Sequence, residues 1–91
     1  MIRSFRHKGL AELFETGASR RVRPDLSDRA LRRLDALHRA RNPGELDIPG
    51  FRLHRLHGNP PRWSIAVNGP WRITFEWIET DAWRVDLEQY H

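Results

Sequence analysis

Residues 62–90 read RWSIAVNGPWRITFEWIETDAWRVDLEQY, three runs in which apolar and polar residues alternate, separated by two short turns. Alternation with a period of two is typical of strands that bury one face of a sheet. The turns are Asn68-Gly69-Pro70 and Glu79-Thr80-Asp81, and turns this short join antiparallel neighbours. The stretch therefore predicts an antiparallel meander with strands over residues 62–67, 71–78 and 83–90.

Two segments outside this stretch also have strand character. Residues 51–57 (FRLHRLH) alternate in the same way, and Gly58-Asn59-Pro60-Pro61 supplies a turn into the meander. Residues 2–6 (IRSFR) are typical of a short first strand.

The intervening segment has the spacing of two helices. Leu10, Leu13 and Phe14 form the apolar stripe of a helix over residues 8–16, which Gly17 is placed to end. A second helix is expected from Pro24, with Asp25 or Ser27 as its cap, to a stop at Asn42-Pro43-Gly44. Its predicted buried face is Ala30, Leu31, Leu34 and Leu37, and its remaining surface carries Arg29, Arg32, Arg33 and Arg39.

An apolar sheet face needs cover, and these two helices are the available cover. We therefore expect an α+β fold, with two N-terminal helices packed on one face of a twisted antiparallel sheet, as one domain over residues 1–91. The strand residues predicted to face the helices are Phe51, Leu53, Trp63, Ile65, Val67, Trp71, Ile73, Phe75, Trp77, Trp83, Val85 and Leu87.

Composition narrows the function classes. The 91 residues contain no cysteine, which excludes disulfides and thiolate chemistry. The formal net charge is +4, from 16 Lys and Arg against 12 Asp and Glu, and all of these cations except Lys8 are Arg. A positive surface rich in guanidinium groups favours a polyanionic partner such as nucleic acid. Residues 1–10 lack the apolar run of a signal peptide, so we expect a soluble, cytoplasmic protein without a membrane partner.

Strand alternation also predicts what the uncovered face carries. If the residues above face inward, then His54, Arg72, Arg84 and Tyr90 share the opposite surface, joined by His91 at the end of the last strand. Cleavage of RNA without a metal needs such groups. Imidazole can take up or release a proton near neutral pH, guanidinium can neutralise charge that develops on a phosphate, and tyrosine can stack on a base.

Ordinary structural roles compete with this interpretation. An arginine or tyrosine on the polar face of a strand is usually a solvated residue. His54 and His57 have H-x-x-H spacing, but residues i and i+3 of a strand lie on opposite faces, so we expect no metal and no cofactor. The basic run Arg29, Arg32 and Arg33 is usually a solvated helix face, although it could contact RNA phosphates.

The chain as a whole resembles the HigB-type toxins of the RelE/ParE superfamily, mRNA interferases of type II toxin-antitoxin systems. The residues that carry this resemblance follow one another over nearly the whole chain with similar spacing. They are MIRSFRHKGL at residues 1–10, Phe14-Glu15, LHRL at 53–56 followed by Gly58, WSI at 63–65, WRITF at 71–75, and Tyr90-His91.

The resemblance implies a RelE-like fold and ribosome-dependent cleavage of mRNA in the A site. It implies a HigA-like antitoxin as partner, the 70S ribosome with mRNA as target, and operator DNA bound by the toxin-antitoxin complex through the antitoxin. The catalytic set it implies is His54, Arg72, Tyr90 and His91. The further residues we expect to contact RNA or the ribosome are Lys8, Arg29, Arg32, Arg33, Arg52, His57 and Arg84.

The chain departs from the family pattern at three places. Gln89 stands where some relatives have Asp, His57 stands where relatives carry Lys, and the turn at residues 68–70 lacks a basic residue. Gln89 cannot act as a base, which leaves the identity of the general base open. Two other functions stay possible on this scaffold: a ParE-like toxin that inhibits a protein target, and an inactive module that binds RNA or the ribosome.

Overall fold

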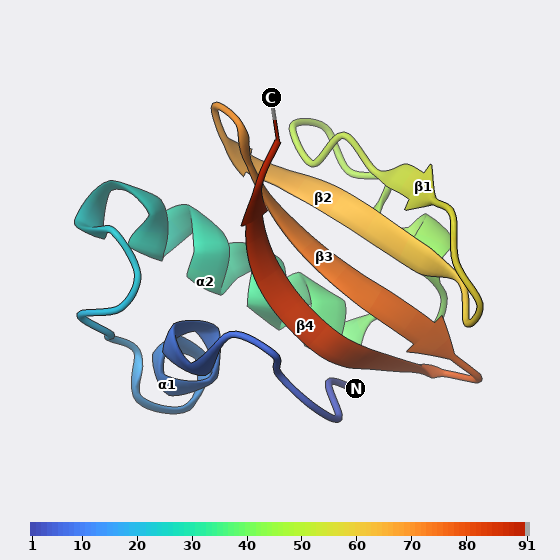
Figure 1. Cartoon of the computed structure of the whole chain (residues 1–91), viewed down its shortest axis with the longest axis horizontal. Helices are drawn as coiled ribbons and strands as arrows, with labels where there is room; N and C mark the ends of the chain where they lie inside the picture. The colour runs from blue at the N-terminus through green and yellow to red at the C-terminus, as the bar shows by residue number, and fades with distance from the viewer. Residues whose placement is uncertain (91) are drawn as a thin grey trace.

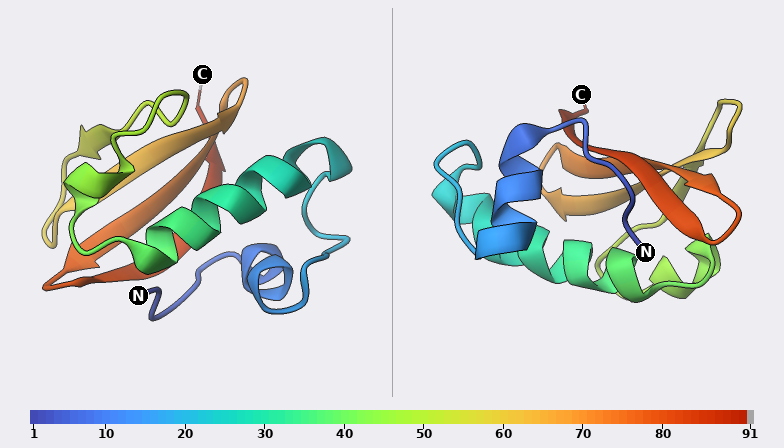
Figure 2. Two further views of the ribbon diagram at one scale, coloured as in Figure 1. Left: turned by 180° about the vertical axis from the view of Figure 1, so that it is seen from behind. Right: turned by 90° about the horizontal axis from the view of Figure 1, so that it is seen from below.

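The computed structural model describes residues 1–90 (Figure 1). The elements follow one another as α1 (Lys8–Thr16), α2 (Pro24–Arg39), the short 3-10 helix η1 (Pro43–Leu46), β1 (His54–Leu56), β2 (Arg62–Asn68), β3 (Trp71–Ile78) and β4 (Asp81–Gln89). The strands form one antiparallel sheet in the order β1-β2-β3-β4. Both helices lie on the same face of this sheet (Figure 2). The predicted α+β architecture is therefore confirmed.

The first helix has the predicted bounds and both of its ends are capped. The His7 Nδ1 accepts a hydrogen bond of 3.1 Å from the backbone N–H of Leu10. At the other end Gly17 adopts φ +86°, and its N–H donates to the Leu13 carbonyl. Glycine adopts this left-handed backbone without steric cost, which is why α1 ends there.

The second helix begins at Pro24 as predicted, but its cap differs from the prediction. The residue before the helix is Arg23, which makes no side-chain cap. Asp25 instead forms an ion pair with Arg23 at 2.9 Å, and the Ser27 Oγ donates to the Arg23 carbonyl. Proline at the first helical position has no N–H to satisfy, so one of the usual needs for a cap is absent.

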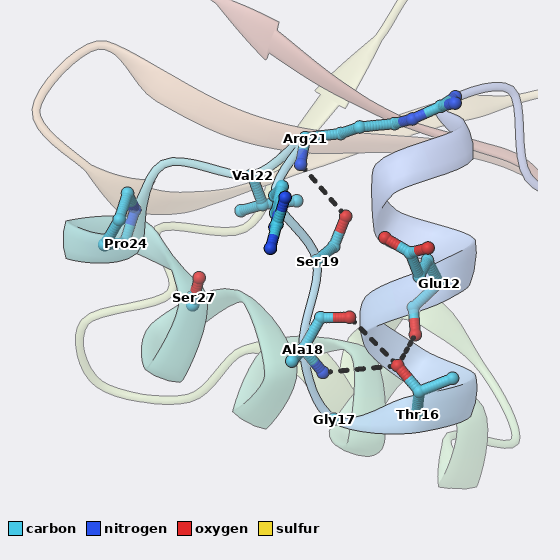
Figure 3. Close-up of a pocket in the computed structure, with 10 residues that line it drawn as sticks. Glu12, Thr16, Gly17, Ala18, Ser19, Arg21, Val22, Pro24 and Ser27 are labelled. Carbon is cyan, nitrogen blue, oxygen red and sulfur yellow. Dashed lines mark hydrogen bonds between the residues drawn. The ribbon is translucent and has the colours of Figure 1, made fainter.

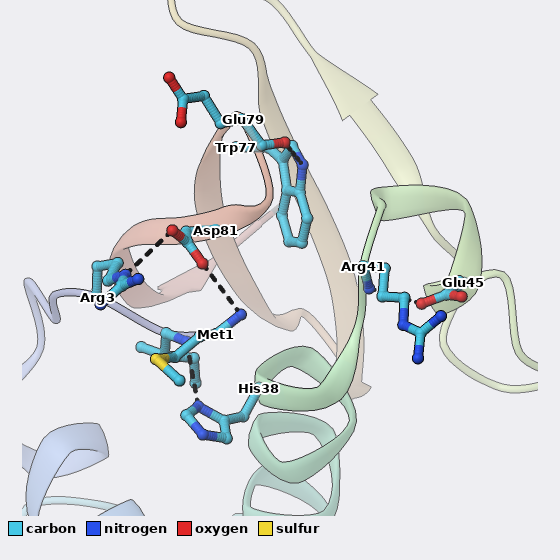
Figure 4. Close-up of polar contacts among 9 residues, drawn as sticks. Met1, Arg3, His38, Arg41, Glu45, Trp77, Glu79 and Asp81 are labelled. Carbon is cyan, nitrogen blue, oxygen red and sulfur yellow. Dashed lines mark hydrogen bonds and ion pairs between the residues drawn. The ribbon is translucent and has the colours of Figure 1, made fainter.

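The N-terminal segment is extended, but it is not the regular strand predicted over residues 2–6. It runs parallel to β4 and makes isolated bridges from Ile2 to Ala82 and from Phe5 to Val85. Below it (Figure 4), the backbone N–H of Ile2 donates to Nδ1 of His38 on α2 at 3.1 Å. These contacts fix the segment between β4 and the helix layer.

The central parts of the strands are as the alternation predicts, but the bounds of two strands differ from the prediction. The strand predicted over residues 51–57 is shortened to His54–Leu56, because Arg52 has φ +48° and cannot continue an extended ladder. The last strand begins at Asp81 instead of residue 83.

A β-bulge in β4 reverses one predicted side-chain direction. The register passes from Thr74 opposite Asp86 to Glu76 opposite Trp83, and Arg84 within this step has φ +50°. Residues directly opposite each other share a face, so Trp83 lies on the same face as Glu76, away from the helices. The prediction that Trp83 faces the helix layer is therefore wrong.

The core lies between the helices and the sheet. Its fully buried members come from both layers and include Leu10, Leu13, Leu26, Ala30, Leu34, Leu37, Ile65, Ile73, Phe75 and Val85. Leu31, Trp63, Trp71 and Leu87 are partly buried and pack against this cluster.

The prediction for Arg33 on α2 is also wrong. Arg33 was expected on the exposed surface of α2, but only 9% of the residue is exposed. Its Nε donates to the Ala66 carbonyl at 2.6 Å, and its guanidinium carbon lies 4.6 Å from the centroid of the Phe51 ring. Burial lowers the pKa of Arg33, and the positive charges of Arg29 and Arg32 act in the same direction. Arg33 therefore fastens α2 to β2 and is not part of an exposed basic surface.

Candidate active site on the open face of the sheet

The open face is the sheet surface away from the helices. One row of facing residues crosses all four strands on this surface: His54, Ser64, Thr74 and Asp86. A second row holds Ala66, Arg72 and Glu88. The predicted sharing of one face by His54 and Arg72 is therefore correct.

Arg72 is the best-anchored of the predicted catalytic residues. Its Nε donates to Ser64 Oγ at 3.0 Å, and its Nη2 donates to the Arg52 carbonyl at 2.7 Å. The guanidinium carbon lies 5.9 Å from the centroid of the Tyr90 ring. A guanidinium has five N–H donors, so these contacts fix its orientation while leaving donors for a phosphate oxygen.

Two further predicted residues lie around this guanidinium. His54 is exposed on β1 and faces Ser64, the residue that accepts from Arg72. Tyr90 follows β4 with 37% of its surface exposed, and its backbone N–H donates to the Pro70 carbonyl. An imidazole, a guanidinium and a phenol are thus grouped at one end of the open face. His91, the fourth predicted catalytic residue, lies outside the described residues.

Arg84 belongs to a different part of the face. Its Nη1 forms an ion pair of 2.7 Å with Glu76 Oε1, beside the bulge that turns Trp83 to the open face. Glu76 is four residues from Arg72 along β3, a distance of about 13 Å at the usual rise of a strand. Arg84 is therefore separated from Arg72, the residue that lies near His54 and Tyr90.

Four polar residues of this face, Arg62, Ser64, Thr74 and Glu88, were not predicted to be site residues. Ser64 and Thr74 are fully buried although no helix covers them. Glu88 Oε2 accepts from Thr74 Oγ1 and, at 3.1 Å, from Arg62 Nη2. The alternation that placed Arg72 on this face places Arg62 and Ser64 there as well, so their position could have been predicted from the sequence. Their hydrogen bonds could not have been predicted from the sequence, because each bond joins residues from different strands.

The residues expected to bind RNA or the ribosome are divided by the structure. Lys8, Arg29, Arg32, Arg52 and His57 are exposed, whereas Arg33 is buried. His57 lies in the loop after β1, where strand alternation no longer determines its direction.

One surface depression contains none of the predicted site residues. It measures about 790 Å³ and lies between the end of α1 and the start of α2 (Figure 3). Its lining includes Glu12, Thr16, Arg20, Val22 and Ser27, and contains none of the predicted site residues. A smaller depression of about 410 Å³ is lined by Arg29, Arg52 and Arg72 among others.

The family model described as "RelE-like toxin of type II toxin-antitoxin system HigB" matches residues 3–91. This chain is a HigB-like toxin. It is 45% identical to "Endoribonuclease HigB" of Proteus vulgaris over 92 residues, with 100% of both chains covered. It is 33% identical to "Toxin HigB-1" of Vibrio cholerae serotype O1 over 93 residues, covering 99% of this chain and 98% of the relative.

Family membership confirms the predicted HigB-type, RelE-like toxin, and it gives this HigB-like toxin an antitoxin as partner. The predicted endoribonuclease activity agrees with the name of the Proteus vulgaris relative. No helix within residues 1–90 has the length and apolar character needed to cross a membrane.

Proposed function

We propose that this HigB-like toxin is an endoribonuclease that cuts mRNA in the A site of the ribosome by a metal-free mechanism. The observation that carries the proposal is the anchored guanidinium of Arg72, which has Tyr90 beside it and His54 across Ser64. Its family and the name of the Proteus vulgaris relative support the same activity.

The proposed reaction is an attack of the 2′-hydroxyl on the adjacent phosphorus. The 2′-oxygen forms a new bond to phosphorus while the bond to the 5′-oxygen breaks, which leaves a 2′,3′-cyclic phosphate and a free 5′-hydroxyl. The 2′-hydroxyl proton passes to a base, and a proton is delivered to the departing 5′-oxygen. Two proton transfers and one stabilised pentavalent phosphate are therefore required.

The residues of the open face divide these tasks. Arg72 binds the reacting phosphate, because a fixed guanidinium stabilises the charge that develops on its oxygens without reorganising. His54 or His91 moves the protons, and Tyr90 positions the neighbouring base or nucleotide. Gln89 has no ionisable group, so the proposal assigns it no proton transfer.

The test is cleavage of mRNA on programmed ribosomes by the purified wild-type toxin and by Arg72→Ala. Loss of one preorganised donor of this kind lowers the cleavage rate about 100- to 1000-fold. Arg20→Ala is the matched control, because Arg20 is exposed in the loop between α1 and α2 and loses the same charge; it should cleave at the wild-type rate. Cleavage at defined codon positions that disappears in Arg72→Ala is the expected result.

Two outcomes would count against the proposal. Absence of cleavage by the wild type, despite growth arrest on expression, would favour a ParE-like toxin that inhibits a protein target. Binding to the ribosome without cleavage or growth arrest would favour an inactive binding module.

A further inference from the structure

The smaller depression has an unusual lining for the surface of a protein. It lies where α2, the segment before β1 and the β2–β3 turn meet. Its lining residues are Arg29, Gly50, Arg52, Ala66, Val67, Asn68, Gly69 and Arg72. Three of these eight residues are arginines, and none of the eight is acidic. We call this depression the arginine pocket.

Contacts at its rim hold two of the three arginines in place. Arg29 Nη1 donates to Asn68 Oδ1 at 3.4 Å, which draws the α2 side chain to the β2–β3 turn. Arg72 Nη2 donates to the Arg52 carbonyl at 2.7 Å, which ties β3 to the segment before β1. Asn68 and the Arg52 carbonyl are neutral, so these contacts orient the guanidinium groups without neutralising them.

Three arginines line this one depression, so their positive charges repel one another, and an anion bound there offsets this repulsion. The forked donors of guanidinium match the oxygens of a phosphate. The turn residue Gly69 has φ +57°, and a side chain added there would meet no neighbouring atom within 4 Å. The backbone at this rim is therefore open to a ligand.

Arg72 lines both the arginine pocket and the candidate active site, so the two are continuous. A nucleic-acid strand carries a phosphate at every nucleotide. Consider an RNA strand whose reacting phosphate lies on the side of Arg72 that faces Ser64. Its neighbouring phosphate then lies on the other side of Arg72, close to Arg29 and Arg52. We infer that the arginine pocket binds a non-reacting phosphate of the RNA strand next to the cleavage point, with Arg29 as its dedicated contact. This inference rests on the proposed function for the identity of the strand, but not for the binding of phosphate.

The first experiment tests phosphate binding alone. Inorganic phosphate is titrated into the isotope-labelled toxin at constant ionic strength, with chloride as the competing anion, and the backbone amides of Gly50, Asn68 and Gly69 are followed by NMR. Saturable shifts of these amides are expected in the wild type. Because a charge-assisted hydrogen bond is lost, Arg29→Gln should weaken the apparent affinity about tenfold.

Arg39→Gln is the matched control. Arg39 is exposed near the end of the same helix and loses the same charge, but it does not line the pocket. The control should titrate as the wild type does. Shifts that do not saturate, or that are equally weakened in both variants, would overturn the pocket as a phosphate site.

The second experiment asks whether the phosphate belongs to RNA. Toxin binding is measured to ribosomes programmed with a 2′-O-methyl mRNA that cannot be cleaved, with one linkage at a time replaced by a neutral methylphosphonate. At one linkage the replacement should weaken binding of the wild type but not of Arg29→Gln. The slope of log affinity against log salt should fall by about one in the same variant.

Absence of binding, or a loss in Arg29→Gln that is the same at every linkage, would overturn RNA as the source of the phosphate. Neither experiment depends on cleavage. If the toxin cuts no mRNA but both experiments succeed, the proposed function fails and the pocket stands. If cleavage occurs but the phosphate titration is flat, the pocket fails and the proposed function stands.

Discussion

Ile73 and Thr74 are neighbours on β3, and neither has any exposed surface, yet they lie on opposite faces of the sheet. Ile73 is buried by the apolar cluster beneath the helices. Thr74 lies on the open face, where no helix covers it, and its hydroxyl donates to Glu88. The same alternation of residues thus produces two kinds of burial, one by apolar packing and one by long polar side chains.

The difference bears on function because the two kinds of burial respond differently to a ligand. Packing beneath the helices depends on shape and is damaged by any loss of volume. On the open face, Arg72 covers Ser64 and Glu88 covers Thr74 through hydrogen bonds to hydroxyl groups. The guanidinium of Arg72 has further N–H groups that can donate to an incoming phosphate, so this side chain both covers the open face and offers it a binding contact.

The strongest test of this contrast uses two tryptophans that the alternation alone would place on the same face. Trp77 is 8% exposed beneath the helices, and its Nε1 donates to the Glu79 carbonyl, whereas the bulge at Arg84 turns Trp83 to the open face. Trp77→Ala should lower the free energy of unfolding by about 3–5 kcal/mol. Trp83→Ala should cost less than half as much. Urea unfolding followed by circular dichroism measures both, and equal losses would contradict the bulged register.

Much of the fold could be predicted because strand alternation and helix spacing are local. The bounds of α1 and β3 were predicted correctly from such patterns, and so was the placement of His54 and Arg72 on one face. The bulge at Arg84 could not be predicted, because positive φ there is adopted by a residue that carries no sequence signal for it.

Other features of the site depend on contacts between distant residues. The burial of Arg33 requires the Ala66 carbonyl, 33 residues away along the chain. The grouping of Arg29 with Arg72 requires α2 to cross the β2–β3 turn. By contrast, Arg62 and Ser64 could have been found by applying to β2 the same alternation that identified Arg72.

A second prediction separates the buried arginine of α2 from its exposed neighbours. Arg33→Met keeps most of the side-chain volume against Phe51 but removes the donor to the Ala66 carbonyl. A buried acceptor left without a partner costs about 1–3 kcal/mol, so the free energy of unfolding should fall by that amount. Arg32→Met, at an exposed position of the same helix, should change it by less than about 0.5 kcal/mol. Chemical denaturation distinguishes the two, and an equal effect would mean that Arg33 is not a structural arginine.

A third prediction tests whether hydrogen bonding, and not apolar packing, stabilises the open face. Thr74→Val keeps the shape of the side chain and removes the hydroxyl that donates to Glu88. Loss of this bond should lower the free energy of unfolding by about 1 kcal/mol. Because Arg62 also donates to Glu88, the double variant Thr74→Val, Glu88→Leu reveals whether the network as a whole is stabilising. A gain in stability in Thr74→Val alone would show that packing dominates on both faces.

The smallest expected effect on the free energy of unfolding comes from Asp81, which belongs neither to the apolar core nor to the polar network of the open face. Asp81, at the start of β4, accepts from Arg3 Nε at 3.1 Å, and its Oδ1 lies 3.4 Å from the amino group of Met1 (Figure 4). The hydrogen bond from Arg3, together with these positive charges, lowers the pKa of Asp81 below its ordinary value of 3.8. A carboxyl group with a lower pKa in the folded state than in the unfolded state stabilises the fold where it is ionised in both.

The stabilisation by Asp81 should therefore be present at neutral pH and disappear as the pH falls below about 3.8 and through the lower pKa of the folded state. Asp81→Asn should unfold more easily than the wild type at neutral pH, and the two should converge in acid. Urea unfolding at a series of pH values measures this difference. Asp28→Asn, on the exposed surface of α2, is the control for the loss of one negative charge. Because Asp81 is solvent-accessible, salt should reduce the difference in stability at neutral pH. A difference that persists unchanged in acid would contradict the prediction. It would mean that Asp81 stabilises the N-terminal segment through its shape and hydrogen bonds and not through its charge.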